Sequence, residues 1–331
     1  MAIQDGFAII VPVKEINDYI RESVPITLAL DYENFEIIIL PNELPSKPEP
    51  FLDHPKVKII PTGRVSPATK RDMAARETDF RWLAFLDDDA YPAKDWLRVA
   101  ERIFKTKKVQ GIGGPGITPP GSGVLKQASG LFFETLIGGG GMDYRYKPGK
   151  RTDFFVDDYP TVNLIVDKEA FFDAGGFDNN YWPGEDTKFC LDFTNKGHKI
   201  MYSRDLVVWH HRRDVIGPHL KQVGNYGLHR GYFAKKFPKT SARLVYFVPS
   251  IFFLGNLFML LDWMTFQSLT YLSAAGLGLY VLIAFFDVLS RTKKIPLILT
   301  TMLTVYLSHL YYGYMFLKGL CSTKHLQSQL R

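Results

Sequence analysis

Three consecutive aspartates are the most chemically suggestive residues of the sequence. In FLDDDAYP, Asp87, Asp88 and Asp89 follow an apolar run that ends at Leu86. Because side chains alternate along an extended chain, Asp87 and Asp89 are expected to point the same way. Carboxylates at this density suit Mg²⁺ or Mn²⁺, which share protein carboxylates with substrate phosphates. The alternative is a solvated acidic turn that caps the helix expected after Pro92.

A second acidic pair, Glu185 and Asp186, stands in the segment WPGEDTKFCLDFTNKG. The pattern predicts a helix that begins at this pair and is ended by Gly197. Acidic residues at a helix N-terminus often do no more than interact with the helix dipole. The same dipole nevertheless favours an ionised Asp186, and a general base must be ionised. For this pair taken alone, both interpretations stay open.

Elements that could position these carboxylates alternate along the front of the chain. Apolar runs at 7–13, 35–40, 57–60 and 82–86 are separated by segments of helical potential such as 16–30 and 68–78. This order predicts an α/β fold with a mostly parallel sheet flanked by helices. Ligands of such sheets bind outside the carboxyl ends of the strands. Residues 12–15, 41–43, 61–64 and 87–89 are therefore expected to line the site.

The glycine-rich segment GIGGPG, residues 111–116, matches the dinucleotide pattern G-x-G-x-x-G by its letters. That pattern requires a helix that starts at the glycines and receives the pyrophosphate. Here Pro115 and the following TPPGSG prevent such a helix. The sequence therefore does not favour a membrane-bound NAD-dependent dehydrogenase.

Composition separates the chain into a nearly neutral front and an apolar rear. Of 40 Lys and Arg and 34 Asp and Glu in the 331 residues, only seven and two fall within 240–331. Most of the net charge of +6 comes from the apolar rear, so it does not form a basic patch on a folded domain. A nucleic-acid partner is therefore not expected. The two cysteines, Cys190 and Cys321, lack the spacing of a zinc site or a disulfide framework.

Hydrophobic stretches in the rear are long enough to cross a bilayer. They lie at about 244–261, 266–289 and 295–317. Basic residues precede the first stretch and separate the second from the third, which places the front domain in the cytoplasm by the positive-inside rule. The sequence thus predicts a cytoplasmic domain over 1–240 and membrane-associated helices over 241–331. Whether the third stretch spans or lies in the interface stays open, because its polar-tipped residues also suit an interfacial helix.

The ordered motifs resemble those of the family 2 glycosyltransferases, which are inverting enzymes with a GT-A fold. The resemblance covers about residues 7–213 through PVKE, LPNE, TGRVSPATKRD, FLDDDAYP, TVNLIV, AGGFD, PGED and VVWHHRR. It implies a nucleotide-diphosphate sugar as donor and Mg²⁺ or Mn²⁺ as cofactor. The implied metal residues are Asp89, Asp87 and His210, although a structural histidine is an equal alternative at 210. The implied nucleotide-sugar residues are Pro12, Val13, Glu15, Asn42, Lys70, Arg71, Asp87 and Asp88.

The same resemblance implies Asp186 as the catalytic base, with Glu185 beside it. Gln222 and Tyr226, in QVGNY, occupy the spacing of the Q-x-x-R-W motif of processive members, but Asn225 replaces the arginine. Processive synthesis is therefore not inferred. Trp182 offers an aromatic platform for an acceptor sugar, with core packing as the alternative. The candidate acceptor residues are thus Trp182, Gln222, Tyr226 and Arg230.

Together these observations predict a hexosyltransferase-type enzyme of the cytoplasmic membrane, with several spans and its catalytic domain facing the cytoplasm. Its acceptor is expected to be a lipid-linked or other membrane-associated glycan, as in synthesis of cell-surface polysaccharide or glycoconjugates. The alternative is a membrane protein that binds nucleotide sugars without catalysis. The sequence leaves the sugar, the nucleotide and the oligomeric state open, a homo-oligomer included.

Overall fold

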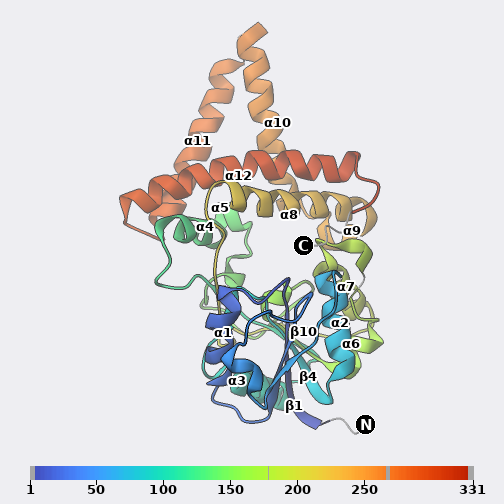
Figure 1. Ribbon diagram of the computed structural model, residues 1–331. Coiled ribbons are helices and arrows are strands. Elements are labelled where there is room, and N and C mark those ends of the chain that lie inside the picture. The colour runs from blue at the N-terminus through green and yellow to red at the C-terminus, as the bar shows by residue number, and fades with distance from the viewer. Residues whose placement is uncertain (1–3, 178, 266–268, 327–331) are drawn as a thin grey trace. The chain divides into compact units, whose positions relative to one another are not determined.

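The computed structural model describes residues 4–177, 179–265 and 269–326. The chain forms two compact units (Figure 1). Among the described residues, unit 1 contains those of 4–119 and 147–211, and unit 2 contains those of 120–146 and 212–326. The division differs from the boundary expected at residue 240, because segments 120–146 and 212–240 belong with the apolar helices. Asp178 of the AGGFD motif and residues 266–268 of the second apolar stretch lie outside the described residues.

Unit 1 is built on an eight-stranded sheet of order β3-β2-β1-β4-β9-β6-β10-β8. Its strands are β1 (Gln4–Pro12), β2 (Phe35–Leu40), β3 (Val57–Ile59), β4 (Phe80–Phe85), β6 (Gly111–Gly113), β8 (Phe154–Val156), β9 (Leu164–Asp167) and β10 (Ile200–Tyr202). A second sheet of order β5-β11-β7 contains β5 (Ala90–Pro92), β11 (Val208–His210) and β7 (Gly116–Ile117).

The four apolar runs predicted as strands are β1 to β4, and they pair in parallel. β9 lies antiparallel between β4 and β6, and β8 is antiparallel to β10. The prediction of a mostly parallel sheet with flanking helices is confirmed. The Gly111–Gly113 and Gly116–Ile117 strands occupy the glycine-rich segment, so no helix starts at its glycines.

Helices cover both faces of the large sheet. In Figure 1, α1 (Asp18–Leu28) and α3 (Trp96–Thr106) lie on one side, while α2 (Pro67–Glu77), α6 (Lys168–Asp173) and α7 (Glu185–Asn195) lie on the other. Alternate side chains of β1, namely Phe7, Ile9 and Val11, join the core cluster that includes residues of α1 and α3. The alternation gives the central strand two buried faces, which explains why its sequence is continuously apolar. Short 3₁₀ turns η1 (Pro50–Asp53), η3 (Thr161–Asn163) and η4 (Asn179–Tyr181) lie in the connections.

Unit 2 is helical within its described residues. It contains α4 (Val124–Glu134), α5 (Leu136–Gly139), η2 (Asp143–Arg145), α8 (Gly217–Lys236), α9 (Pro238–Ser241), α10 (Leu244–Thr265), α11 (Thr270–Leu289) and α12 (Ile295–Cys321). Among the described residues, α10, α11 and α12 are long and apolar enough to cross a membrane. Of the 18 most apolar consecutive residues in each helix, 6% are buried in α10, 11% in α11 and 39% in α12. α12 therefore has far more protein around it than the other two.

The extra burial of α12 comes mainly from α8, which runs alongside it (Figure 1). Glycines allow the two backbones to approach closely. A Cβ added to Gly231 would lie 2.0 Å from the Phe316 carbonyl oxygen, and one on Gly319 would lie 2.1 Å from the Leu228 carbonyl oxygen. A buried histidine also joins the helices, since the His219 ring nitrogens contact Ser129 Oγ at 2.8 Å and Ser308 Oγ at 3.0 Å. Burial lowers the pKa of His219 to about 4, so this link is neutral at physiological pH.

Replacing Gly231 by alanine is expected to destabilise unit 2 by about 1–3 kcal/mol, because the methyl group meets backbone that cannot rotate away. The melting temperature of the full chain in detergent measures this loss. Gly255→Ala on α10 is the matched control, since nothing lies within 4 Å of its added Cβ. Equal melting temperatures for the two variants would contradict the close contact of α8 and α12.

Candidate active site

Asp87, Asp89 and His210 come together in unit 1. Asp87 and Asp89 follow β4, and His210 ends β11. Because β11 pairs antiparallel with β5, His210 stands opposite Ala90 and therefore beside Asp89. The His210 Nε2 and Asp89 Oδ1 atoms are 3.1 Å apart, and ligand atoms of all three residues lie within 4.8 Å of one another. The pairing of β5 and β11 thus assembles the set predicted to hold a metal.

The donor set fits a divalent cation. Two carboxylates suit Mg²⁺ or Mn²⁺, and an imidazole nitrogen is a common further ligand for transition metals. Asp89 is only 3% exposed. A carboxylate buried to this degree requires a compensating positive charge or hydrogen bonds. The chemistry of these residues is therefore compatible with the predicted Mg²⁺ or Mn²⁺.

Arg71 connects the two acidic motifs. The buried guanidinium of Arg71, on α2, donates to Asp87 Oδ1 at 2.9 Å through Nη2. Its Nη1 donates to Glu185 Oε1 at 3.4 Å. Asp87 and Glu185 are 98 positions apart in the sequence, yet both contact one side chain. The two acidic motifs therefore belong to the same site in unit 1.

Glu185 and Asp186 differ in environment although they are neighbours at the start of α7. Glu185 is buried, and burial raises its pKa; the nearby negative charges of Asp186 and Asp87 act in the same direction, against Arg71. Asp186 is half-buried, and its Oδ1 accepts a hydrogen bond from the Thr187 N–H at 2.7 Å. A general base works best with a pKa near the operating pH, so a raised pKa does not exclude Glu185. The role of Asp186 as the catalytic base stays a prediction.

Lys70 joins the ends of two strands. Its Nζ donates to the Val13 carbonyl at 2.6 Å, to the Leu40 carbonyl at 3.0 Å and to Asn42 Oδ1 at 2.7 Å. Burial lowers the pKa of Lys70 to about 8, opposed by the charge of Asp88. The lysine thus positions the loop residues predicted to line the nucleotide site. Direct contact between Lys70 and a nucleotide stays a prediction, as do the roles of Pro12, Val13, Glu15 and Asn42.

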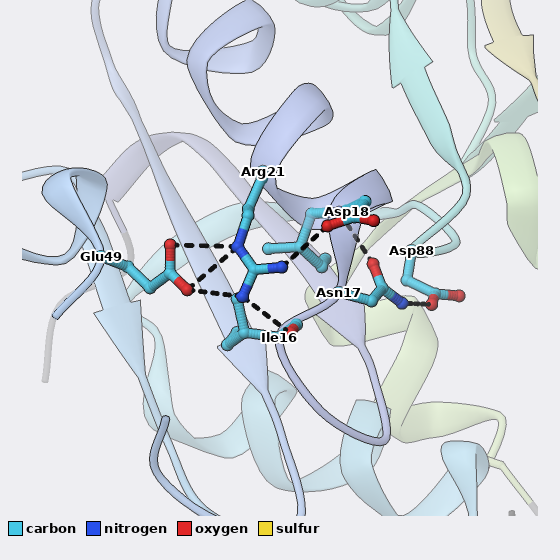
Figure 2. A network of polar contacts seen from close by, with 7 residues as sticks. Ile16, Asn17, Asp18, Arg21, Glu49 and Asp88 are labelled. Carbon is cyan, nitrogen blue, oxygen red and sulfur yellow. Dashed lines mark hydrogen bonds and ion pairs between the residues drawn. The ribbon is translucent and has the colours of Figure 1, made fainter. Parts of the chain in front are cut away.

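Asn17 is a site residue that the sequence reasoning missed. Figure 2 shows its side chain reaching Asp88, to which its Nδ2 donates at 2.7 Å. Its Oδ1 caps α1 by accepting from the Ile20 N–H at 2.9 Å. An asparagine just before a helical segment is a recognisable N-cap signal, but nothing local indicates the partner at Asp88.

Arg21 anchors the same end of α1. In Figure 2 its guanidinium lies between Glu49 and Asp18, with closest contacts of 2.7 Å and 2.9 Å. It also donates to the Ile16 carbonyl at 3.3 Å. These contacts connect the loop before α1 to the 3₁₀ turn η1, so the segment that carries Asn17 is held from both sides.

Asp72, on α2, holds the turn that leads to the second acidic motif. Its Oδ1 accepts a hydrogen bond from the Phe177 N–H at 3.0 Å. Gly176 has a φ of +72°, and an added Cβ there would lie 3.1 Å from each Asp72 carboxylate oxygen. Burial raises the pKa of Asp72 to about 6, against the Phe177 amide and the charges of Arg76 and Arg71.

The raised pKa of Asp72 predicts a pH-dependent stability. The folded state keeps this proton to a higher pH than the unfolded chain, so the free energy of unfolding falls as the pH rises from about 4 to about 6. Asp72→Asn should therefore stabilise the protein by about 1–2 kcal/mol above pH 6 and leave it nearly unchanged near pH 4. Melting curves from pH 4 to 8 measure this difference.

Asp173→Asn is the control for this experiment. The His198 and Lys196 side chains lower the pKa of Asp173, so its replacement should give no gain at high pH. A gain from Asp72→Asn that is the same at every pH would contradict the assignment to its ionisation.

The predicted acceptor residues divide between the two units. Trp182, in unit 1, is 9% exposed. Gln222, Tyr226 and Arg230 lie on α8 of unit 2. Tyr226 is 37% exposed, whereas Arg230 is 8% exposed and lies over the Tyr246 ring at 4.9 Å. The acceptor roles of these four residues stay predictions.

The fold and the site define a glycosyltransferase domain. Residues 8–166 match the family described as Glycosyl transferase family 2, which confirms the resemblance of the motifs. The chain thus carries a domain of that family, with the GT-A arrangement of sheet and helices. No curated protein matches the chain significantly.

The chain is similar to several solved glycosyltransferases. The mannosyltransferase PcManGT from Pyrobaculum calidifontis, in complex with GDP-Man and Mn²⁺, superposes with a TM-score of 0.62 at 16% identity, over 96% of this chain and 88% of that one. S. aureus TarS 1–349 has a TM-score of 0.49 at 16% identity, over 69% of this chain, and this chain spans 64% of it. The complex of TarS 1–349 with UDP-GlcNAc has a TM-score of 0.48 at 15% identity, with coverages of 70% and 71%.

Proposed function

We propose that the protein is a metal-dependent inverting glycosyltransferase that moves a sugar from a nucleotide-diphosphate donor to a lipid-linked glycan acceptor at a membrane. The observation that carries this proposal is Arg71, which donates to Asp87 of the first acidic motif and to Glu185 of the second. The carboxylates predicted to bind a metal and the pair that contains the candidate base are therefore joined by one arginine. The mannosyltransferase PcManGT, which has the same fold, is in complex with GDP-Man and Mn²⁺, and this supports the proposal.

The reaction is a single displacement at the anomeric carbon. Asp186 accepts the proton of the acceptor hydroxyl, whose oxygen forms the new bond to that carbon. The bond from the carbon to the diphosphate oxygen breaks, and its electron pair leaves with the diphosphate. Attack on the face opposite the leaving group inverts the anomeric configuration, so an α-linked donor gives a β-linked product.

The remaining residues of unit 1 orient the donor. Asp87, Asp89 and His210 would hold Mg²⁺ or Mn²⁺, which when bound neutralises charge on the diphosphate. Arg71 holds the Asp87 carboxylate in place through one hydrogen bond. A second hydrogen bond, to Glu185, holds the start of α7 beside Arg71. Lys70 positions Asn42 and the end of β1, where the nucleotide is expected.

The rear helices suit a membrane anchor. We assign α10 and α11 as spans, since their apolar side chains are mostly exposed, and place α12 in the interface beside α8. Lys235, Lys236 and Lys239 precede α10, and Lys293 and Lys294 follow α11. By the positive-inside rule both ends of the hairpin then face the cytoplasm, together with unit 1. This is the side on which nucleotide sugars are available to a cytoplasmic enzyme.

A donor screen tests the function. Purified full-length protein in detergent is incubated with UDP- and GDP-linked sugars, Mn²⁺ or Mg²⁺ and a membrane-lipid extract, and nucleoside diphosphate release is measured. One donor should be turned over, and EDTA should abolish its turnover. Donor binding without turnover under all conditions would instead support a non-catalytic nucleotide-sugar-binding protein.

A further inference from the structure

The metal turn, defined here as the three aspartates at 87–89, places three carboxylates on successive residues. A hydrogen bond of 3.1 Å from the Ala90 N–H to the Asp87 carbonyl closes this turn. Carboxylates this close repel one another, so the turn keeps a single conformation only when groups outside it hold the side chains. Arg71 of α2 contacts the first carboxylate, and His210 of β11 lies beside the third.

The middle carboxylate, Asp88, is held by Asn17, which lies just before α1 (Figure 2). Asn17 Nδ2 donates to Asp88 Oδ2 at 2.7 Å, and both side chains are only partly exposed. At the other end of the amide, Oδ1 accepts from the Ile20 N–H at 2.9 Å. Only the nitrogen can donate to a carboxylate and only the oxygen can accept from an N–H, so the two partners fix the orientation of the amide. Asp88 is therefore tied to the first turn of α1.

Helix α1 also holds the metal turn at a second point, through His211. The rings of Tyr19 and His211 lie 4.9 Å apart, and Glu22 Oε2 lies 3.0 Å from His211 Nε2. The His211 N–H donates to the Asp89 carbonyl at 2.9 Å. α1 thus supports the side chain of Asp88 directly and the backbone of Asp89 by way of His211.

We propose that Asn17 is a positioning residue for the metal site, because it fixes the metal turn in the conformation in which Asp87 and Asp89 can share one cation. In this role it acts through Asp88 and makes no contact with the metal. A turn that is ordered in advance loses less conformational freedom when its carboxylates bind a cation, so the loss of Asn17 should weaken metal binding. The inference deepens the proposed function and rests on it only for the metal set.

Binding of Mn²⁺ to the full chain in detergent, without donor, tests this role, with free Mn²⁺ measured by electron paramagnetic resonance. Asn17→Ser keeps an oxygen that can cap α1, but its short side chain cannot also reach Asp88. The Kd of this variant for Mn²⁺ should rise about three- to tenfold, less than the about 10- to 100-fold typical when a partner of the metal ligand itself is removed. A wild-type Kd in Asn17→Ser would overturn the proposal.

Exchange of the two side chains distinguishes positioning from direct metal binding by Asp88. The double variant Asn17→Asp with Asp88→Asn keeps the net charge, an N-cap oxygen and a hydrogen bond between the two positions. Its Kd for Mn²⁺ should return to within about twofold of the wild-type value, since the turn is again held to α1. A Kd as weak as that of Asn17→Ser would assign Asp88 itself to the cation, and the positioning role would be wrong.

Asp167→Ala is the control for a general loss of stability. Asp167 caps α6 by accepting from the Glu169 and Ala170 N–H groups, and it stands opposite Trp82, toward the end of β4 that is remote from the metal turn. Its removal should lower the melting temperature and leave the Kd for Mn²⁺ unchanged. A rise in Kd as large as that of Asn17→Ser would reduce the effect to destabilisation and contradict the proposal. Absence of donor turnover would refute the proposed function but leave the Mn²⁺ comparison standing.

Discussion

Replacing Asp186 by asparagine is expected to lower kcat by about 10²–10⁴ fold, the usual contribution of general base catalysis. Asparagine keeps the size of the side chain and can still accept the Thr187 N–H bond that Asp186 Oδ1 accepts at 2.7 Å. It cannot take a proton from the acceptor hydroxyl. The donor KM should therefore change little while kcat falls, as steady-state kinetics with the donor found in the screen would measure.

Two further variants on α7 sharpen this experiment. Glu185→Gln should reduce kcat less than Asp186→Asn does, because burial already favours the protonated form of Glu185. Asp192→Asn removes a carboxylate that pairs with Lys188 on the same helix, and it should leave kcat near the wild-type value. A wild-type rate in Asp186→Asn would remove this residue as the base. A larger loss in Glu185→Gln would transfer the role to Glu185.

Replacing Asp89 by asparagine is expected to lower turnover by about 10³ fold or more, because the substitution removes a buried negative charge from the metal set of Asp87, Asp89 and His210. Asp89 is 3% exposed, and its Oδ1 lies 3.1 Å from His210 Nε2. Because the position is buried, a carboxylate at the protein surface cannot replace the lost ligand. The Mn²⁺ concentration needed for half-maximal activity should rise strongly. Titration of activity with Mn²⁺ and the electron paramagnetic resonance signal of bound Mn²⁺ measure the two effects.

Asp95→Asn is the control for the metal experiment, since this exposed residue precedes α3 as its N-cap and makes no side-chain cap hydrogen bond. It should keep the wild-type Mn²⁺ dependence. Unchanged Mn²⁺ binding in Asp89→Asn would contradict the metal set of Asp87, Asp89 and His210.

Local pattern was sufficient to predict part of the elements of unit 1. The run predicted at 35–40 is β2 (Phe35–Leu40), and the helix predicted to begin at Glu185 does so and ends before Gly197, whose φ is +90°. Such features depend on residues a few positions apart, because strand burial and helix ends are decided by neighbours along the chain. The apolar length of α10 and α11 was likewise readable from composition.

Contacts between distant segments were not predictable in the same way. The Q-x-x-R-W spacing at Gln222 and Tyr226 drew attention to a possible ligand role, whereas the glycines of that same helix place its backbone against α12. Asn17 reads as a helix cap, yet it also contacts Asp88 across 71 positions. The spacing of nearby residues predicts neither the contact of α8 with α12 nor the contact of Asn17 with Asp88.

The chemistry available to this protein was thus present in its amino-acid types: carboxylates after strand β4, a carboxylate pair opening α7, and apolar helices behind them. Their assembly depends on the packed chain. Arg71 joins Asp87 to Glu185 because the fold brings α2 beside both the residues after β4 and the start of α7. His210 meets Asp89 because β11 pairs with β5. Local propensity acts over a few residues, whereas a site of this kind is formed by the burial of many side chains at once, which brings segments about a hundred residues apart into contact.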